Sequence, residues 1–240
     1  MGERHCLKIV TGQNDPANSD KEWGQGIMTK KEKMQRFETK GIYGITAENL
    51  SAGRKNGEVV REMLEAGIRI IQYREKKKSM AEKYEECLEL RKLTRDYGAL
   101  LIVNDHPDLC LLTDADGVHV GQDDYPVVAV RELIGSERIL GWSTHEPRQL
   151  QEAHALGVDY AGVGPLFETH TKEDVMAPVG LSYLEWAVAN ARLPFVAIGG
   201  IKERNFHEVV SRGAKCICLV SEITQHPDII GKINKLAGLF

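Results

Sequence analysis

The chain has 240 residues, a formal net charge of −4 at pH 7, 42% hydrophobic residues and 28% charged residues. This length fits one large domain or two small ones, and the composition is typical of a soluble protein with a substantial core. The acidic balance argues against a protein whose main surface binds nucleic acid or an anionic membrane, because such surfaces are usually basic. An anionic ligand would therefore need a local basic pocket.

The cysteines and the first residues bear on location and domain organisation. The five cysteines form no CxxC and no metal-finger spacing, which is typical of reduced thiols, so we expect a cytoplasmic protein. No apolar run approaches the roughly 18 residues that a membrane span needs. Residues 1–40 contain no apolar stretch suited to secretion. We expect them to form a loosely ordered N-terminal extension, followed by one catalytic domain over residues 41–240.

From residue 41 onward, short apolar runs alternate with segments of helical spacing. The predicted strands span residues 42–46, 68–73, 99–104, 117–121, 138–144, 160–167, 195–200 and 216–221. Predicted helices between them include residues 58–67, 80–98, 147–157 and 205–214. Gly67, Gly98, Gly157 and Gly213 stand at or near the ends of these helices, as left-handed C-caps require. Ser79 and Ser182 are predicted N-caps.

This alternation predicts the fold. Near-continuous apolar strands that alternate with amphipathic helices favour a parallel sheet buried on both faces. Eight such units match a single (β/α)₈ TIM barrel. An open doubly wound sheet is the alternative, but no strand is followed by GxGxxG with a downstream acidic residue. In a barrel, functional side chains lie at the C-terminal ends of the strands.

Two aspartates follow neighbouring predicted strands. Asp105 comes directly after the third strand, and Asp124 comes shortly after the fourth. Because the carboxyl ends of barrel strands share one opening, both side chains can reach a single site. Two hard carboxylates without His or Cys companions suit Mg²⁺, which takes few protein ligands besides water and phosphate oxygens. We therefore expect Asp105 and Asp124 to bind Mg²⁺ as a cofactor.

The second predicted strand ends in a basic cluster. The stretch RIIQYREKKK (69–78) places Arg74 and Lys76 at the strand end, beside the predicted metal site. Arginine offers a planar fork and lysine a compact charge, and both suit phosphate. We expect these two side chains to bind a diphosphate, whose charge one Mg²⁺ neutralises only in part. Lys77 and Lys78 are expected to belong to the solvated start of the next helix.

A second anion site is predicted after the last two strands. Gly199 and Gly200 would let backbone N–H groups approach an anion, and Ser221 follows the eighth strand. The loops after these strands form a recurrent phosphate site in barrels. The residues alone therefore indicate two phosphorylated small molecules, or one with a phosphate at each end. Nucleophilic catalysis is not indicated, because no Ser–His–Asp order and no reactive cysteine follows a strand.

Seven short motifs occur in order along the chain: QYREK (72–76), VND (103–105), GVHVGQDD (117–124), GWST (141–144), DYAGVGPLFETHTKED (159–174), VAIGGI (196–201) and LVSEI (219–223). Together they resemble the thiamine phosphate synthase family from about residue 42 to the C-terminus. The resemblance implies a Mg²⁺-dependent transferase of thiamine biosynthesis. It would join 4-amino-2-methyl-5-hydroxymethylpyrimidine diphosphate to thiazole phosphate, giving thiamine phosphate and pyrophosphate. The implied partners are two small phosphorylated substrates, with no nucleic acid and no membrane, and a homodimer is left open.

The resemblance also implies roles for individual residues. The pyrimidine diphosphate is expected to bind Gln72, Tyr73, Arg74, Glu75, Lys76, Asn104, Ser143 and Lys172. The thiazole phosphate is expected to bind Thr169, His170, Thr171, Gly200, Val220 and Ser221. The implied metal ligands are again Asp105 and Asp124. The implied catalytic residues are Arg74, Lys76, Lys172 and Ser143.

Three positions depart from the family pattern. His106 stands where arginine is common, so its charge depends on pH near neutrality. Glu222 replaces a small apolar residue beside the predicted phosphate loop, and we expect its carboxylate to point away from that loop. Glu168 stands where proline is frequent, which leaves its loop less constrained.

Three alternatives remain open from the sequence. A thiazole tautomerase-like barrel would not need Asp105, Asp124 and Lys172 together. A phosphosugar isomerase or decarboxylase would need a base at a strand end, a position that Glu75 occupies. A non-catalytic thiamine-precursor binder would keep the pocket without turnover, and His106 and Glu222 are its only support.

Overall fold

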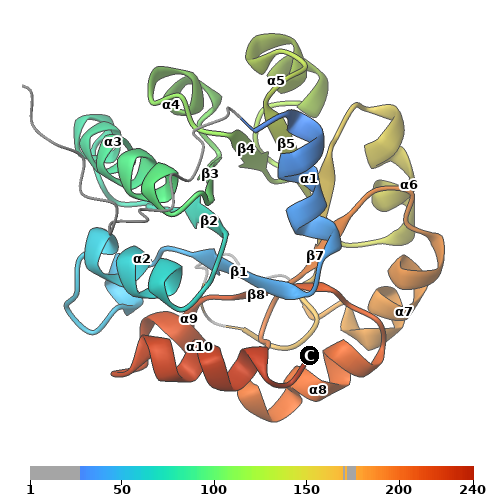
Figure 1. Ribbon diagram of the computed structural model, residues 1–240. Helices are drawn as coiled ribbons and strands as arrows, with labels where there is room; N and C mark the ends of the chain where they lie inside the picture. Colours follow the sequence, from blue (N-terminus) through green and yellow to red (C-terminus); the bar gives the residue numbers. More distant parts are fainter. Residues whose placement is uncertain (1–27, 170, 172–176) are drawn as a thin grey trace, which may run out of the picture.

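The predicted TIM barrel is confirmed in a computed structural model, which describes residues 28–169, 171 and 177–240. Eight parallel strands close into a barrel in chain order, with β8 paired to β1 (Figure 1). The strands are β1 (Gly41–Ile45), β2 (Ile70–Tyr73), β3 (Leu100–Asn104), β4 (Gly117–Val120), β5 (Ile139–Thr144), β6 (Tyr160–Val163), β7 (Phe195–Ala197) and β8 (Cys216–Leu219). Each lies within one of the eight apolar runs or overlaps it by all but one residue.

Helices surround the barrel, and one follows each strand (Figure 1). They are α2 (Asn56–Glu65), α3 (Met80–Asp96), α4 (Pro107–Leu112), α5 (Val127–Ile134), α6 (Pro147–Ala155), α7 (Gly180–Asn190), α8 (Glu203–Ser211) and α10 (Ile229–Ala237). A 3₁₀ turn, η1 (Glu48–Leu50), precedes α2, and the single turn α9 (Ser221–Thr224) precedes α10.

The helix boundaries follow mostly from local sequence. The four predicted cap glycines all adopt positive φ, between 57° and 97°. Ser79 caps α3 as predicted, and it forms a reciprocal capping box with Glu82. The predicted cap at Ser182 is wrong, because α7 begins at Gly180 with Val179 as its N-cap. Ser182 therefore lies inside the first turn of this helix.

The apolar core has two layers, separated by the strands. Alternate residues of each strand point to opposite faces, so Tyr43 and Ile45 of β1 lie inside the barrel while Ile42 packs outward. The inner layer also contains Ile70, Leu100, Ile102, Ile139, Tyr160, Val196, Cys216 and Cys218. The larger outer layer fills the space between strands and helices. This alternation decides which strand residues can face a ligand inside the barrel.

A helix before β1, α1 (Lys30–Glu38), closes the N-terminal end of the barrel (Figure 1). Its residue Phe37 is 1% exposed, and its ring centroid lies 4.3 Å from that of Tyr160 and 6.2 Å from that of Tyr43. Residues 30–38 therefore contribute a side chain to the inner layer, although the sequence placed the domain boundary at residue 40. Residues 1–27 of the expected extension lie outside the described residues.

Two ion pairs hold α1 in this position. Lys30 Nζ lies 2.7 Å from a carboxylate oxygen of Asp159, and Lys33 Nζ lies 2.8 Å from one of Asp116. Asp159 and Asp116 immediately precede β6 and β4, so the helix covers the strands' N-terminal ends. The opposite end of the barrel stays available for a ligand.

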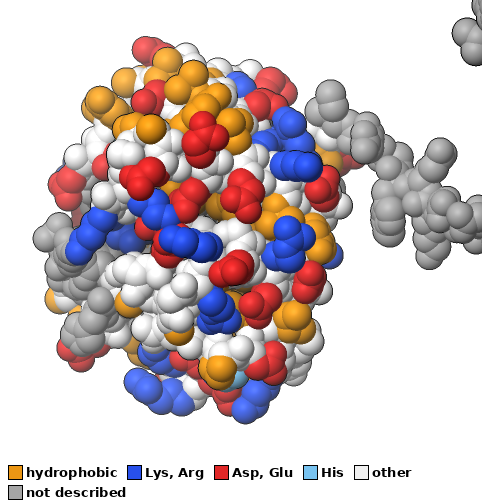
Figure 2. Space-filling model, turned by 90° about the vertical axis from the view of Figure 1, so that its left-hand side faces the viewer, with side chains coloured by type: hydrophobic (Ala, Val, Ile, Leu, Met, Phe, Trp, Pro, Cys, Tyr) orange, Lys and Arg blue, Asp and Glu red, His pale blue; other side chains and the backbone are white. Residues whose placement is uncertain are grey.

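The surface carries charges of both signs. On the face seen in Figure 2, lysines and arginines are interspersed with acidic side chains, and apolar side chains gather toward the top. Such mixing produces no broad field of one sign on this face. In the part of the chain that the structure describes, no helix is long and apolar enough to cross a membrane.

Candidate active site

Three charged side chains meet at the C-terminal end of the barrel. Asp105 follows β3 and Asp124 lies in the loop after β4, and the two carboxyl groups are close enough for each to shift the pKa of the other. From the end of β2, Lys76 places its Nζ atom 2.5 Å from Asp105 Oδ2. The loops after three neighbouring strands thus bring two acidic side chains and one lysine together.

The backbone fixes both aspartates. Asp105 has φ +65°, a left-handed conformation that is uncommon outside glycine and often found at functional sites. Its N–H donates to the carbonyl of His119 at 2.8 Å. Asp124 accepts a hydrogen bond at 2.7 Å from the N–H of Gly121. These bonds hold the two carboxyl groups at one opening.

The aspartate pair shares its charge unevenly. Burial alone would raise the pKa of Asp105, but hydrogen bonds from Lys76 and Asp124 outweigh it and lower that pKa. Burial raises the pKa of Asp124, and the neighbouring Asp105 carboxylate adds to the effect. Two carboxylates in contact repel each other unless a proton or a cation compensates. The pair therefore has the electrostatic need that a divalent cation would meet.

The carboxylates of Asp105 and Asp124 suit Mg²⁺ whose remaining ligands are water and phosphate oxygens. Across the described ranges, no group of three or more His, Cys, Asp or Glu side chains forms a metal cluster. Mg²⁺ commonly binds through one or two carboxylates and completes its octahedron with water and substrate phosphate oxygens. Asp105 and Asp124 would supply such a carboxylate pair at the open end of the barrel.

Arg74 is positioned beside this group. Its N–H donates to the hydroxyl of Thr46 at 2.8 Å, and that buried hydroxyl donates back to the Arg74 carbonyl at 3.3 Å. With the residues that the structure describes, the guanidinium makes no hydrogen bond or ion pair. Its full set of donors is thus available to an anion.

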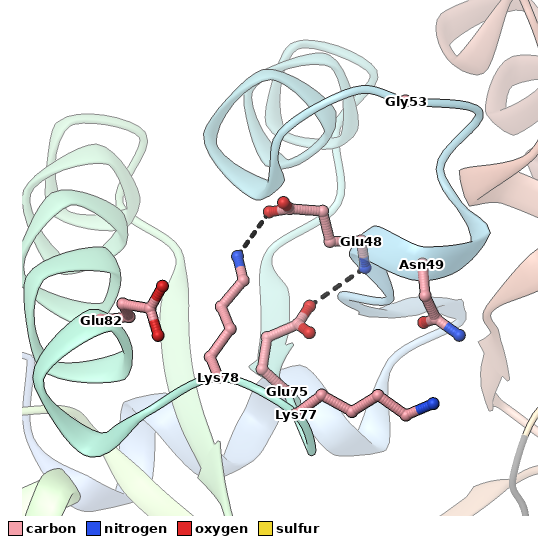
Figure 3. A pocket seen from close by; sticks show the side chains of 7 residues that line it. All are labelled: Glu48, Asn49, Gly53, Glu75, Lys77, Lys78 and Glu82. Carbon is pink, nitrogen blue, oxygen red and sulfur yellow. Dashed lines mark hydrogen bonds and ion pairs between the residues drawn. The ribbon is translucent and has the colours of Figure 1, made fainter.

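Two other residues of the QYREK motif point elsewhere. The Tyr73 side chain is 2% exposed in the outer core layer, and its hydroxyl donates to Glu86 at 2.7 Å. The carboxylate of Glu75 accepts hydrogen bonds from Asn56 Nδ2 at 2.9 Å and from the Glu48 N–H at 3.0 Å (Figure 3). The alternation along β2 could have predicted the outward orientation of Tyr73, because its neighbour Gln72 faces inward.

A shallow pocket of about 380 Å³ lies between the loop after β1 and the loop after β2 (Figure 3). It is lined by Glu48, Asn49, Gly53, Glu75, Lys77, Lys78 and Glu82. Lys78 pairs there with Glu48 and Glu86. Lys78 is matched by two acidic side chains here, whereas the Arg74 guanidinium at the barrel mouth makes no ion pair with the described residues, so the mouth is the better anion site.

Gln72 and Ser143 lie inside the upper part of the barrel. Gln72 is 4% exposed, and its Nε2 donates to the Tyr43 hydroxyl at 3.0 Å. Ser143 Oγ lies 3.0 Å from Nε2 of His119, and its carbonyl accepts from Gln122 Nε2 at 2.6 Å. Both predicted pyrimidine-binding side chains are therefore held by buried or half-buried neighbours.

Asn104 and His106 flank Asp105. Asn104 ends β3 in register with His119, and its carbonyl accepts the N–H of His106 at 2.9 Å. The ring of His106 is partly buried, and its Nε2 lies 3.1 Å from the ammonium group of the buried Lys83. Burial and then this positive neighbour lower the pKa of His106. The neutral ring is therefore favoured at neutral pH.

The loops after β6 and β7 pack closely through glycine. A Cβ atom at Gly199 would lie 2.3 Å from Pro165 Cα, and one at Gly200 would lie 2.4 Å from the Glu168 carbonyl oxygen. Both glycines have positive φ, of 100° and 64°. Glycine is thus required here by close backbone approach as well as by conformation. As a result, the backbone of Gly200 lies against Glu168, the residue before Thr169.

A cluster of alternating charges lies beside Ser221. Lys202 Nζ is 3.4 Å from Ser221 Oγ and 3.5 Å from a Glu222 carboxylate oxygen. The other Glu222 oxygen is bound by Lys232 at 2.6 Å and accepts the Glu203 N–H at 3.2 Å. Glu222 is thus already neutralised by Lys232, and Lys202 is the half-exposed cation nearest to the Ser221 hydroxyl.

The remaining expected thiazole phosphate residues are only partly described. Thr169 and Thr171 are hydrogen-bonded to each other through their hydroxyls at 3.2 Å. Val220 follows β8 and packs against the inner core layer. His170 and Lys172 lie outside the described residues.

Comparison with known proteins decides the family. The family model for thiamine monophosphate synthase matches residues 42–223. The chain belongs to the thiamine monophosphate synthase family. It is 60% identical over 198 residues, or 82% of its length, to a thiamine-phosphate synthase of Pelotomaculum thermopropionicum, covering 91% of that protein. It is 54% identical over 209 residues, or 87% of its length, to one of Caldicellulosiruptor saccharolyticus, covering 95% of that protein.

A solved structure agrees with this membership. The thiamine phosphate pyrophosphorylase from Pyrococcus furiosus superposes with a TM-score of 0.77 at 36% identity, covering 85% of this chain and 96% of that one. The resemblance found in the sequence motifs is thus confirmed at the level of family and fold. The tautomerase-like and non-catalytic alternatives are not favoured by these relatives.

Sequence reasoning missed several polar residues at the family's barrel mouth. The sequence predicted no role for His119, Tyr160 or Tyr43. A period of two along β4 places His119 inside, level with Ser143 of β5, which is the signal that was available. Lys202 carries no such signal, because its partner Glu222 is distant in sequence.

Proposed function

We propose that this protein condenses 4-amino-2-methyl-5-hydroxymethylpyrimidine diphosphate with thiazole phosphate, giving thiamine phosphate and pyrophosphate. The observation that carries the proposal is the 60% identity to a thiamine-phosphate synthase, which extends over 91% of that relative. The convergence of Asp105, Asp124 and Lys76 at one barrel mouth supports the same reaction. An acid pair beside two cations is the arrangement that a metal-bound diphosphate needs.

The diphosphate would be bound by the groups around β2 and β3. Arg74 has an unused guanidinium for bidentate contact with phosphate oxygens, and Lys76 adds a point charge. Asp105 and Asp124 would hold Mg²⁺, which when bound would supply charge stabilisation to the leaving pyrophosphate. Lys172 would add a further positive charge on the same leaving group.

The thiazole phosphate would be bound at the loops after β7 and β8. The backbone at Gly200, the hydroxyl of Ser221 and the nearby Lys202 ammonium offer donors of suitable kind. Because Lys202 interacts with Glu222 only at 3.5 Å, an incoming phosphate competes with a weak ion pair. Lys202 is thus a candidate phosphate ligand of this chain.

The carbon–nitrogen bond would form without a protein nucleophile. Departure of pyrophosphate leaves a resonance-stabilised pyrimidine methylene cation, to which the thiazole nitrogen adds. Burial raises the pKa of the Cys216 thiol to about 12, so this inner-layer thiol is not a nucleophile at neutral pH. The protein contributes positioning and electrostatic stabilisation.

A cytoplasmic location is part of the proposal. Cys87, Cys110, Cys216 and Cys218 are free and buried in the described part of the chain. Unpaired thiols of this kind are typical of reducing compartments.

The reaction itself is a direct test. Purified protein is mixed with both substrates and Mg²⁺, and thiamine phosphate and pyrophosphate are quantified by chromatography. We expect the two products in equal amounts, and neither when one substrate is omitted. Binding of both substrates without product would support a precursor binder and overturn the proposal.

A further inference from the structure

A chain of hydrogen bonds crosses the barrel interior between two strand ends. From Gln72 on β2 it passes to the Tyr43 hydroxyl at 3.0 Å, and from there to the Tyr160 hydroxyl at 2.9 Å. It continues to Nδ1 of His119 at 2.9 Å, and from Nε2 of His119 to Ser143 Oγ at 3.0 Å. Four strands besides β2 contribute one side chain each, and the two ends are both expected pyrimidine-binding residues.

We propose that Tyr43, Tyr160 and His119 are positioning residues, which hold Gln72 and Ser143 in one geometry and direct the Ser143 hydroxyl proton toward the pyrimidine. This inference rests on the proposed function, because Gln72 and Ser143 matter only if the pyrimidine binds at this mouth. It adds an interior network whose members do not touch the substrate themselves.

The hydrogen-bond chain needs a residue without a side chain at Gly141. A Cβ atom at Gly141 of β5 would lie 2.3 Å from Cζ of Tyr160 and 2.4 Å from Nδ1 of His119. Gly141 has no positive φ, so only space explains the need for glycine there. The absence of a side chain on β5 is therefore what allows the hydrogen bond between Tyr160 and His119.

The two tyrosines are fixed as neutral hydroxyls. Tyr43 is 2% exposed and Tyr160 is 1% exposed, and burial raises the pKa of both phenols. Phe37 of α1 packs on both rings from the closed end of the barrel. The hydroxyls therefore have little freedom to find other partners, and each must both donate and accept within the chain.

The proposed proton order lets each hydroxyl of the chain donate once. The Gln72 amide donates to Tyr43; in this order Tyr43 donates its own proton to Tyr160, and Tyr160 donates to Nδ1 of His119. A neutral His119 that accepts at Nδ1 carries its proton at Nε2 and donates it to Ser143 Oγ. The Ser143 proton is then left to donate into the mouth, where it would meet an acceptor atom of the pyrimidine.

The first test compares two tyrosine hydroxyls. Tyr160→Phe removes two links of the chain, whereas Tyr183→Phe removes another buried hydroxyl, which donates to Thr144 at 2.9 Å in the outer layer. We expect both variants to lower the melting temperature. Only Tyr160→Phe should also lower kcat/KM for the pyrimidine diphosphate, by about 10-fold. Equal kinetics for the two variants would overturn the proposal.

Coupling to Ser143 separates positioning from general destabilisation. In the wild-type background, Ser143→Ala should lower kcat/KM strongly, and in the Tyr160→Phe background it should lower it much less. Fully additive effects would contradict the proposed chain. If Ser143→Ala has no effect in the wild type, its substrate contact is refuted as well, while thiamine phosphate formation by the wild type tests the reaction separately.

The proton order has its own readout, measured on the wild-type protein. ¹⁵N NMR of the wild-type protein distinguishes the two neutral tautomers of a histidine. We expect the Nε2–H tautomer at His119, assigned by its loss in His119→Asn. An Nδ1–H tautomer would reverse the chain and overturn the assignment of Ser143 as a donor.

Discussion

The ammonium group of Lys76 lies 2.5 Å from a carboxylate oxygen of Asp105, and the pKa of Asp105 is lowered by this lysine and by the neighbouring Asp124. The side chains proposed to bind diphosphate and metal are therefore already in contact with one another. Their charges offset each other, and a metal-bound diphosphate would exchange into this pre-arranged cluster. Such pre-organisation lowers the cost of ordering the site.

Lys76→Ala should weaken binding of the pyrimidine diphosphate. The Lys76 side chain is 57% exposed, so its loss should change the free energy of unfolding by less than about 1 kcal/mol. KM for this substrate should rise by at least about 10-fold, because a charge-assisted contact to phosphate is lost. The matched control is Lys77→Ala, because the Lys77 side chain lines the shallow pocket between the loops after β1 and β2. Equal effects of the two substitutions would contradict the role of Lys76.

Lys202→Ala should act on the other substrate. The Lys202 ammonium lies 3.4 Å from Ser221 Oγ, at the proposed thiazole phosphate site. We expect steady-state kinetics to show a higher KM for thiazole phosphate, by about 10-fold, with KM for the diphosphate unchanged. Lys235→Ala serves as the control, since Lys235 pairs with Glu203 and is 64% exposed. An unchanged KM for thiazole phosphate in Lys202→Ala would remove this residue from the site.

Phe37→Ala should destabilise the whole barrel. The ring is 1% exposed and fills the inner layer against Tyr160, so its removal should cost about 3–5 kcal/mol of unfolding free energy. Urea denaturation measures this loss, with the exposed Gln35→Ala on the same helix as control. A loss below about 1 kcal/mol would mean that α1 is an appendage and not part of the domain's core.

The stability of the fold should depend on pH through Glu203. Hydrogen bonds from Lys232 and Lys235 lower the pKa of Glu203 to about 2 from an ordinary value of 4.5. A carboxyl group with a depressed folded-state pKa stabilises the fold above its unfolded-state pKa, and this contribution disappears as the pH falls through the folded-state pKa. The difference in melting temperature between wild type and Glu203→Gln should therefore be largest near neutral pH and shrink below pH 4.5. A difference that stays constant into acid would contradict the lowered pKa.

The barrel and its charged strand ends were accessible from sequence because both depend on local pattern. An apolar run of strand length marks each strand of the barrel, and Asp105 directly follows one of these runs. Helix α1 could not be found in this way. Of its nine residues only Phe37 is buried, so it has no apolar stripe, and it is held by ion pairs to residues distant in sequence.

The interior hydrogen-bond chain was hidden for a different reason. Each member is a single residue on its own strand, and a lone His119 or Tyr160 in an apolar run is ordinary core by composition. Only the closure of the barrel brings the strands to the register that joins them. Glu75 illustrates the converse: it stands in the QYREK motif, yet its carboxylate accepts a hydrogen bond from Asn56 at the start of α2.

Binding of pyrophosphate, measured by calorimetry with and without Mg²⁺, tests the central claim most directly. Wild type, Asp124→Asn and the neighbouring, exposed Asp123→Asn are compared, so that the metal pair is altered in one variant only. The account predicts Mg²⁺-dependent binding in wild type and Asp123→Asn, and a loss of at least about 10-fold in affinity in Asp124→Asn. Binding that is independent of Mg²⁺, or equal in all three proteins, would contradict a metal-assisted diphosphate site at this barrel mouth.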